Sequence, residues 1–306
     1  MQLFKEIVKE TVFRLEMPNQ KLGAPITLVT ISNQNFLINC GSCDAAVADH
    51  LVPALKKKKL SLSKINYLMF TDCHPECIGG AHKLKQLAPG VRILATSYQA
   101  EKLKNPVFHM IERWSDFPDW APPLREIGGM LASNENVENK DGFECIYPIP
   151  AAGHDSSCVC WHVPSCDVLI CGGALQGRGA KDHGIACYND LTAYLETIER
   201  IGYLGSGDTG KRFPSIFLCN EGIEGISGVT EGEEDCRKAL KTCRSAADGY
   251  AKFLHNYMRS HGLNSEMIDY HDLVTEYFPK EKRPECLGFA MMTFKAHGRA
   301  KQNADV

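Results

Sequence analysis

The segment of residues 66–96 constrains the fold most, because it predicts a strand, a helix and a second strand in close succession. Asn66–Thr71 (NYLMFT) and Val91–Thr96 (VRILAT) are apolar, β-rich runs typical of buried strands. A helix is predicted between them over Ala81–Leu87, directly after the Gly79-Gly80 pair. Two strands joined through a helix imply a crossover and a sheet with helices on its outer side, so the predicted fold class is α/β.

Further strands and helices are predicted on both sides of this unit. Ile26–Ile31 and Asn35–Asn39 form a hairpin around a polar turn, and a helix runs from Asp44, its cap, to about Lys58 with a break at Pro53. The remaining predicted strands are Thr11–Glu16, Phe143–Tyr147, Ser157–Val163, Asp167–Cys171 and Ser215–Cys219. The remaining predicted helices are Asn189–Ile201, a stretch from about Gly232, Ser265–Phe278 and a stretch around Leu287–Lys295.

The change of pattern along the chain predicts a core domain over residues 1–230 and a C-terminal helical extension over residues 231–306, packed on the core. Residues 104–141 interrupt the core with a stretch that is poor in regular pattern and holds six prolines and glycines. This stretch also carries Trp114, Phe117 and Trp120. A long loop with aromatic residues inside a compact chain predicts a packed, lid-like insertion.

Charge and hydropathy limit the partners. The formal net charge is only -3, from 34 basic and 37 acidic side chains, so no global field directs the chain to nucleic acid or to an anionic membrane. No stretch approaches the roughly 20 apolar residues of a membrane span, and residues 1–17 lack the apolar run of a signal peptide. We therefore expect a cytoplasmic protein with no nucleic-acid partner and no membrane partner.

The chain is rich in cysteine, with 14 residues. In an oxidising compartment this count would indicate a disulfide framework. Without an export signal, and in a chain of 306 residues, free thiols are expected instead. Most of them should be small buried hydrophobic residues.

Five short motifs follow one another in the order that a known family shows. The loop Thr71–Gly80 (TDCHPECIGG) follows a predicted strand and opens a helix, and it resembles the signature Thr-His-X-His-X-Asp-His-X-Gly-Gly of the metallo-β-lactamase superfamily. Gly153–Ser157 (GHDSS) resembles the family's Gly-His-Thr-X-Gly-Ser, and Asp167–Leu175 resembles its strand ending in Gly-Asp-X-Leu. Asn220–Gly222 stands where the family has Gly-His-Gly, and Asn39–Gly41 resembles its early Asp-Thr-Gly.

The resemblance covers about residues 11–225 and implies the family's fold, a four-layered αβ/βα sandwich of two mixed sheets, here followed by the helical extension. It also implies an active site at one edge, between the sheets, built from the loops at strand ends. In the family two adjacent metals there lower the pKa of bound water, which provides hydroxide at neutral pH.

By this resemblance, one metal site is retained in part. His74 and His154 match histidine ligands of the family, and Asp72 stands for a third histidine. Two imidazoles and one carboxylate suit one Zn²⁺, or alternatively Fe²⁺ or Mn²⁺. Gly173 stands where the bridging aspartate would be and offers no side chain. The alternative is that no metal binds, and that these polar side chains only bond one another and the loop backbone.

The second metal site of the family is rewritten more deeply. Glu76 stands for its aspartate, and Cys77 and Glu221 stand for its two histidines. Without both imidazoles and the bridge, this site is expected to be empty or to serve another purpose. Glu76 and Glu221 are candidate general bases if they are buried. Asn39 replaces an acidic residue that supports the site in the family.

The cysteines near this edge offer a second chemistry. Cys40 and Cys43 form a Cys-X-X-Cys where the floor of the family's active site begins, and Cys73 and Cys77 lie in the signature loop. Thiolates bind soft or borderline metals, and Cys77 with a low pKa could act as a nucleophile. The alternative is that these residues only fill tight space beneath the loops.

Three functions remain open at this point. The resemblance implies a hydrolase that cleaves an ester, thioester, lactone or amide bond of a small-molecule substrate, with at most one metal. A non-hydrolytic enzyme, such as a lyase, isomerase or cyclase, could use the same remodelled pocket. A non-catalytic binding relative is the third. In each case the helical extension is a candidate surface for a homodimer.

Overall fold

The computed structural model describes residues 3–18, 23–104, 137–139, 145–180, 184–206, 212–220, 222–279 and 287–304. The chain divides into two compact units, which we call unit 1 (Met1–Ile149 and Val159–Gly172) and unit 2 (Pro150–Cys158 and Gly173–Val306). The three C-terminal helices lie in the same unit as residues 173–230, so the boundary after residue 230 remains a prediction. Most of the predicted lid, with its aromatic residues Trp114, Phe117 and Trp120, lies outside the described residues. Within its range, residues 137–139 form a strand, where an irregular loop was expected.

Unit 1 contains a seven-stranded sheet with the strand order β1-β2-β3-β4-β5-β6-β7. The first four strands pair antiparallel, and β4 to β7 pair parallel, as the predicted crossover requires. The strands are β1 (Lys5–Val8), β2 (Val12–Leu15), β3 (Ile26–Ile31), β4 (Gln34–Ile38), β5 (Tyr67–Met69), β6 (Arg92–Ala95) and β7 (Val137–Asn139). The hairpin predicted over residues 26–39 is confirmed, with Thr27 opposite Ile38.

The helices of unit 1 are α1 (Val52–Lys57), α2 (Pro75–Ile78), α3 (Ala81–Leu87) and α4 (Ser97–Lys104). A π-helical turn, Ala46–Leu51, runs into α1 just before Pro53. Proline has no N–H and crowds the carbonyl of the preceding turn, so the wider turn accommodates the break that Pro53 predicts. Asp44 does not cap this helix, because no side-chain cap bond forms at its start.

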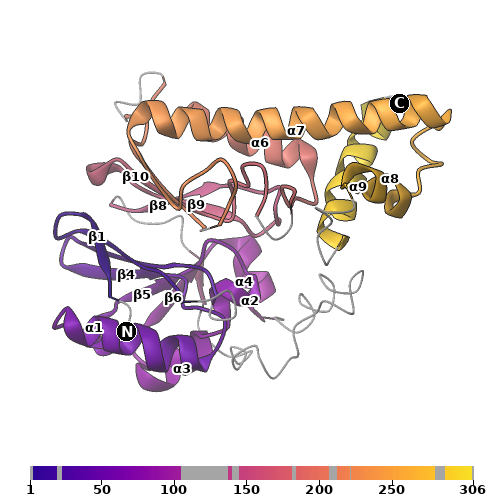
Figure 1. The fold of residues 1–306 in the computed structure, drawn as a ribbon. Helices are drawn as coiled ribbons and strands as arrows, with labels where there is room; N and C mark the ends of the chain where they lie inside the picture. The colour runs from indigo at the N-terminus through magenta and orange to yellow at the C-terminus, as the bar shows by residue number, and fades with distance from the viewer. Residues whose placement is uncertain are drawn as a thin grey trace. The chain divides into compact units, whose positions relative to one another are not determined.

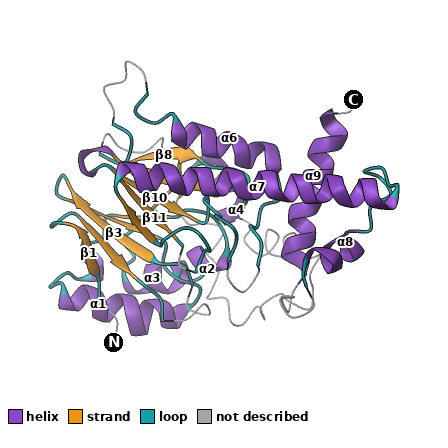
Figure 2. Cartoon of the chain, turned by 45° about the horizontal axis from the view of Figure 1, so that its top comes forward, coloured by secondary structure: helices purple, strands orange, loops and turns teal. Residues whose placement is uncertain are grey.

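One apolar core lies between the sheet and the helices α1 and α3, which run along one face of the sheet in Figures 1 and 2. Leu28, Leu37, Leu68 and Ile93 contribute to it from the strands and are fully buried. The helices contribute Val47, Leu51, Leu55 and Leu84. At about 25 cal/mol per Å² of apolar surface removed from water, this burial stabilises the layer on which the signature loop rests.

A second sheet contains β8 to β12. Within unit 1, β9 (Val159–Val163) pairs antiparallel with β10 (Val168–Gly172). The indole N–H of Trp161, which is fully buried, donates to the carbonyl of Phe70 at 2.8 Å and so ties β9 to the residue just after β5. β8 covers Tyr147–Pro150, so the strand predicted over residues 143–147 begins later than expected, and residues 143–144 lie outside the described ranges.

Unit 2 holds β11 (Ile216–Cys219), β12 (Val229–Glu231) and the helices α6 (Leu191–Gly202), α7 (Glu233–His261), α8 (Tyr270–Tyr277) and α9 (Gly288–Ala304). Strands β11 and β12 pair antiparallel. The 29-residue helix α7 has three acidic residues in its first turn and ends at Gly262 in the left-handed conformation. Figure 2 shows α6 alongside α7, with α8 and α9 towards its C-terminal end. The predicted third C-terminal helix is longer than expected, and the second is shorter.

Aromatic rings join α7, α8 and α9. The ring of Phe253 lies 4.9 Å from that of Tyr277 and 5.8 Å from that of Phe294. Tyr250 packs against the same two rings. Edge-to-face pairs of this kind stabilise packing beyond the area that they bury. The C-terminal helices are therefore packed against one another rather than extended singly.

His297 of α9 is buried beside this cluster, and its Nε2 forms a 2.6 Å hydrogen bond with the hydroxyl of Tyr188. Burial lowers the pKa of His297 from 6.5 to about 4. The other titratable groups near it, Tyr188 and Tyr250, have pKa values raised mainly by burial, so they stay uncharged. The folded protein therefore holds a neutral imidazole where the unfolded chain would bind a proton.

Acid is expected to destabilise the protein through His297. Between pH 6.5 and pH 4 the unfolded chain binds more protons, so stability is fully present above pH 6.5 and falls as the pH decreases through this window. The expected loss from pH 7 to pH 5 is about 2 kcal/mol. Urea unfolding of the wild type and of His297→Gln, whose amide does not titrate, measures it. An equal pH dependence in both proteins would contradict this assignment.

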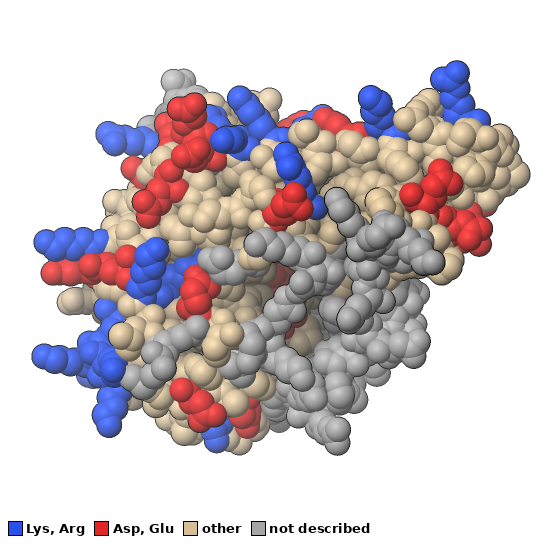
Figure 3. All heavy atoms as spheres, in the orientation of Figure 1, with Lys and Arg blue, Asp and Glu red and all other residues tan. Residues whose placement is uncertain are grey.

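The described helices and one face of the molecule bear on the predicted partners. No helix of the described ranges is long and apolar enough to cross a membrane. In the face drawn in Figure 3, basic and acidic side chains of the described residues are interspersed, without a broad area of one sign. The cysteines of the described ranges, 13 in number, are free, which confirms the prediction of free thiols for these residues.

Candidate functional site

The signature loop of residues 71–78 begins where β5 ends, and Asn39 at the end of the neighbouring strand β4 fastens it. Asn39 has φ 64°, a left-handed conformation that asparagine tolerates. Its side-chain oxygen accepts the backbone N–H of Thr71 at 3.0 Å, and its Nδ2 donates to Thr71 Oγ1 at 3.2 Å. The Asn39 side chain thus supports the start of the loop, which is the role that the resemblance implied for it.

The two glycines after the loop are required by a close approach of backbones. A Cβ atom at Gly79 would lie 2.0 Å from the carbonyl oxygen of Ser42, and one at Gly80 would lie 2.4 Å from that of Cys40. The backbone N–H of Gly80 donates to the carbonyl of Gly41 at 2.8 Å. The signature loop is therefore pinned to residues 40–42 at its far end.

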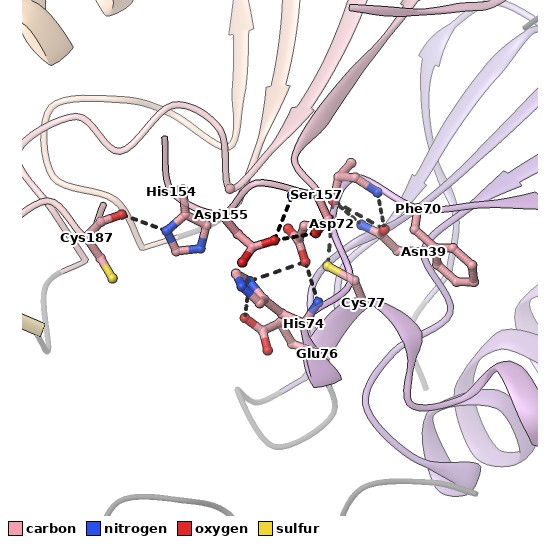
Figure 4. Close-up of polar contacts among 12 residues, drawn as sticks. Asn39, Phe70, Asp72, His74, Glu76, Cys77, His154, Asp155, Ser157 and Cys187 are labelled. Carbon is pink, nitrogen blue, oxygen red and sulfur yellow. Dashed lines mark hydrogen bonds and ion pairs between the residues drawn. The ribbon is translucent and has the colours of Figure 1, made fainter. Parts of the chain in front are cut away.

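Asp72, His74 and Glu76 form the polar part of the loop, as Figure 4 shows. Asp72 Oδ1 accepts the backbone N–H of His74 at 2.9 Å and lies 3.4 Å from the Nδ1 of the same residue. Glu76 Oε1 lies 3.7 Å from that Nδ1. Asp72 and His74 are buried, whereas the side chain of Glu76 is 39% exposed. The burial on which the general-base hypothesis for Glu76 depends is therefore only partial.

Cys77 does not fit the role of a low-pKa nucleophile. The side chain is fully buried, and burial, followed by the charges of Asp72 and Glu76, raises the pKa of the thiol well above its usual range. Its Sγ lies 3.6 Å from the hydroxyl of Thr71. These surroundings count against a reactive thiolate at Cys77, because a carboxylate-lined, desolvated site favours the neutral thiol. The assignment of Cys77 as a nucleophile therefore stays a prediction.

Cys40 and Cys73 also match the structural alternative. Both are fully buried. Burial raises the pKa of Cys40, whose Sγ lies 3.3 Å from the carbonyl oxygen of Cys77. The Sγ of Cys73 lies 3.8 Å from the carbonyl oxygen of Gln99. These residues fill space beneath the loop, and only Cys43 of this set is partly exposed.

In unit 2, His154 is oriented by a backbone carbonyl. Its Nδ1 lies 2.6 Å from the carbonyl oxygen of Cys187, a contact drawn in Figure 4, and the residue is only 7% exposed. A carbonyl only accepts, so Nδ1 carries the proton and Nε2 is the basic nitrogen. A histidine that donates one ring N–H to a carbonyl presents its other nitrogen unprotonated, which is the arrangement common among metal-binding histidines.

Gly173 and Asn220 lie beside this imidazole. A Cβ atom at Gly173 would stand 3.4 Å from His154 Cδ2, 3.6 Å from its Nε2 and 3.4 Å from Asn220 Nδ2. The Oδ1 of Asn220 is buried and has no hydrogen-bond partner among the described residues. The space left by the missing bridging carboxylate is therefore open to a side chain. Glu221, the predicted partner at this end, lies outside the described residues.

Two residues near His154 in unit 2, Asp155 and Gln176, were not singled out from the sequence. Asp155, 5% exposed, accepts the backbone N–H of Ser157 at 2.8 Å through Oδ1, which turns the chain directly after His154. Gln176 bonds the carbonyl of Gly173 and the N–H of Cys187. The Asp-X-Ser spacing could have predicted the turn, whereas the contacts of Gln176 have no local signal.

The donor chemistry of these residues fits a metal in part. Ligands about 2.1 Å from a tetrahedral ion lie about 3.4 Å from one another, close to the 3.4 Å between Asp72 Oδ1 and His74 Nδ1. His154 presents the required tautomer. Among the described residues, however, no group of three or more His, Cys, Asp or Glu is placed to hold a metal ion. The assignment of Asp72, His74 and His154 as ligands thus remains a prediction.

Comparison with known proteins bears on the fold. A family model described as the metallo-beta-lactamase superfamily matches residues 21–218, more than half of the chain. No curated protein matches the sequence. The matched range contains the signature loop, the His154 segment and the strand that ends at Gly172, so it includes most of the residues described above.

Solved structures agree with the family model. The chain is similar to a metallo-beta-lactamase family protein from Thermus thermophilus (TM-score 0.66, 14% identity, covering 96% of this chain and 94% of that one). It is similar to a beta-lactamase domain protein from Burkholderia ambifaria (TM-score 0.63, 18% identity, covering 98% of this chain and 89% of that one). A third similar structure is a metallo-beta-lactamase from Pseudomonas aeruginosa in its mono-zinc form (TM-score 0.52, 13% identity, covering 80% of this chain and 96% of that one). At these identities the similarities concern the fold, and they confirm the predicted α/β sandwich with a C-terminal helical region.

Proposed function

Because this chain belongs to the metallo-beta-lactamase superfamily, we propose that it is a hydrolase of small molecules that acts with at most one bound divalent metal. The bond that it cleaves is an ester, thioester, lactone or amide. The proposal rests on the family and on His154, a histidine at a ligand position of the family whose Nδ1 is oriented by a backbone carbonyl of its own unit.

The orientation of His154 carries the proposal. A histidine buried only to pack would be satisfied by any hydrogen bond, but here Nδ1 donates to the carbonyl of Cys187 and the basic Nε2 adjoins the open space at Gly173. An imidazole fixed in this way is prepared to bind a Lewis acid. The same arrangement would not be needed in a binding protein for apolar molecules.

Asp72, His74 and His154 are the proposed ligands, and Zn²⁺ is the proposed ion, with Fe²⁺ or Mn²⁺ as alternatives. A structural neighbour in a mono-zinc form shows that a protein of this fold can be isolated with one zinc. When bound, the metal would polarise a carbonyl group or lower the pKa of water. Asp72 would act as a ligand while its Oδ1 also fixes the backbone of His74.

Glu76 and Glu221 are the proposed proton carriers. The partly exposed carboxylate of Glu76 lies near His74 and can exchange protons with solvent as well as with a substrate. Glu221 stands in the sequence next to Asn220 and has the same proposed role. Cys77, a neutral thiol, is left out of the proposed catalytic set.

A small-molecule substrate is the proposed partner, rather than nucleic acid. The net charge of -3, and the interspersed charges of the face drawn in Figure 3, give no support for binding to a phosphate backbone. Dimerisation through the helices of unit 2 remains a proposal, as does the cytoplasmic location.

A second candidate function is favoured by Gly173. The absence of a bridging side chain removes the group that holds two metals together in the family, and a reaction that must exclude water would tolerate that loss. A lyase, isomerase or cyclase, or a relative that binds without turnover, would use the same pocket without hydrolysis.

Elemental analysis of protein purified anaerobically, without an affinity metal and without chelator, tests the proposal. We expect about one equivalent of zinc, iron or manganese per chain, together with hydrolysis of at least one ester, thioester or lactone that a chelator abolishes. Folded protein that stays metal-free after reconstitution would overturn the proposed metallohydrolase. Bound metal without any hydrolysis would favour the second candidate.

A further inference from the structure

The carbonyl that orients His154 belongs to a short irregular segment, Ala186–Tyr188, in unit 2. All three backbone N–H groups of this segment donate to side chains: Ala186 to the Tyr250 hydroxyl, Cys187 to Gln176 Oε1 and Tyr188 to Thr293 Oγ1. Buried backbone N–H groups need a hydrogen-bond partner, and here side chains provide it in place of a helix or strand ladder. The position of the Cys187 carbonyl therefore depends on these side chains.

Gln176 holds the segment from one side. Its Oε1 accepts the N–H of Cys187 at 3.4 Å, and its Nε2 donates to the carbonyl of Gly173. The backbone N–H of Gln176 donates to the hydroxyl of Tyr194 at 3.3 Å, and the residue is only 7% exposed. One amide therefore links the peptide that orients His154 to the peptide beside its Nε2.

Helix α9 holds the segment from the other side. The hydroxyl of Thr293, which is fully buried, donates to the carbonyl of Ala186 at 2.7 Å and accepts the N–H of Tyr188 at 3.4 Å. The two bonds bracket Cys187 between its chain neighbours. His297, one helical turn further on, holds the Tyr188 hydroxyl. The C-terminal helix is thus connected by hydrogen bonds to both chain neighbours of Cys187, the residue that orients His154.

We propose that Gln176 and Thr293 are positioning residues for His154. They fix the Cys187 carbonyl that accepts the hydrogen bond from His154 Nδ1. The two side chains are far apart in the sequence of unit 2: Gln176 lies in the loop after β10, and Thr293 lies in α9. Their combined effect is to select the imidazole tautomer that carries its proton on Nδ1 and leaves Nε2 as the basic nitrogen. The selection of the tautomer does not depend on the proposed function. Only the role of Nε2 as a metal ligand rests on it.

The test reads the His154 tautomer directly in the full-length protein after chelator treatment. Nitrogen-15 histidine labelling and long-range proton–nitrogen spectra report which ring nitrogen carries the proton, with the His154 signals identified by their loss in His154→Gln. The wild type should show the Nδ1–H form. In Gln176→Met and in Thr293→Val, both of near-native volume, the ratio of Nδ1–H to Nε2–H should fall roughly three- to tenfold, as expected for the loss of a hydrogen bond.

Matched variants separate positioning from loss of packing. Thr293→Ser keeps the hydroxyl and should retain the wild-type ratio, even where Thr293→Val is too unstable to measure. Thr242→Val removes a hydroxyl that bonds only the carbonyl of Lys238 in its own helix, and Gln86→Met changes an exposed amide, so neither should alter the His154 signals.

The outcomes decide the inference independently of catalysis. A wild-type ratio in folded Gln176→Met and Thr293→Val, or a lowered ratio in Thr293→Ser, would overturn it. A shifted tautomer in a protein that binds no metal would support the positioning role and overturn the proposed metallohydrolase alone. Metal content should fall with the Nδ1–H fraction if both proposals hold.

Discussion

Replacement of His154 or of His74 by alanine is expected to reduce bound metal from about one equivalent per chain to below about one tenth, with little loss of fold. Each change removes one of three proposed protein ligands, and a single ion held by the remaining two protein ligands exchanges readily with solvent and buffer. Both side chains are buried, so each truncation should also cost about 1–2 kcal/mol of stability. Elemental analysis and urea unfolding of the purified variants measure the two effects.

A histidine outside the loop provides the control. His82 lies on α3, where its Nε2 bonds the side chain of Gln86 at 2.8 Å. His82→Ala should keep the full metal content. If His74→Ala and His154→Ala also keep it, the ligand assignment is wrong and the ion is bound elsewhere. If the two variants lose metal but remain folded, the ligands and the fold are separable. The backbone bonds from His74 to Asp72 and from Ser157 to Asp155 do not involve the deleted imidazoles and predict this result.

Gly173→Asp is expected to tighten zinc binding by at least about tenfold, which corresponds to about 1.4 kcal/mol. The added Cβ atom would stand at ordinary contact distance, 3.4–3.6 Å, from His154 and Asn220, so a side chain can begin at this position without moving the backbone. It would stand where the family carries its bridging aspartate and would add an anionic oxygen next to the His154 imidazole. Competition with a chromophoric chelator measures the affinity.

Gly173→Ala isolates the role of the carboxylate, because it adds the same Cβ atom without a ligand. The alanine variant should keep wild-type affinity and stability. Equal affinity in Gly173→Asp and Gly173→Ala would show that the aspartate cannot reach the ion, and would count against His154 as a ligand. A second equivalent of zinc in Gly173→Asp would show that Glu76 and Glu221 still form a second site.

Periodicity predicted much of the fold, because burial in this chain follows regular element patterns. The strand Ile26–Ile31 and the helix Ala81–Leu87 have the predicted bounds. The break at Pro53 was predicted from the missing N–H of proline. β1, β12 and α4 were missed, since they are short and carry no strong apolar period.

The site was predicted less completely, because it depends on burial. Motif order was enough to indicate Asp72, His74 and His154. The neutral state of Cys77 could not be read from its position, since its pKa follows from desolvation and from two nearby carboxylates. Gln176 bonds Cys187, 11 positions away, and Thr293 bonds Ala186, 107 positions away, so no local pattern could have indicated them.

The buried free thiols make local unfolding of each unit detectable by alkylation. Burial raises the pKa of Cys40 and Cys77 in unit 1 and of Cys236 and Cys243 in unit 2. A thiol that is both covered and protonated reacts with an alkylating reagent only when its surroundings open. Each unit therefore carries its own internal reporter of local unfolding, with separate peptides to record the two rates.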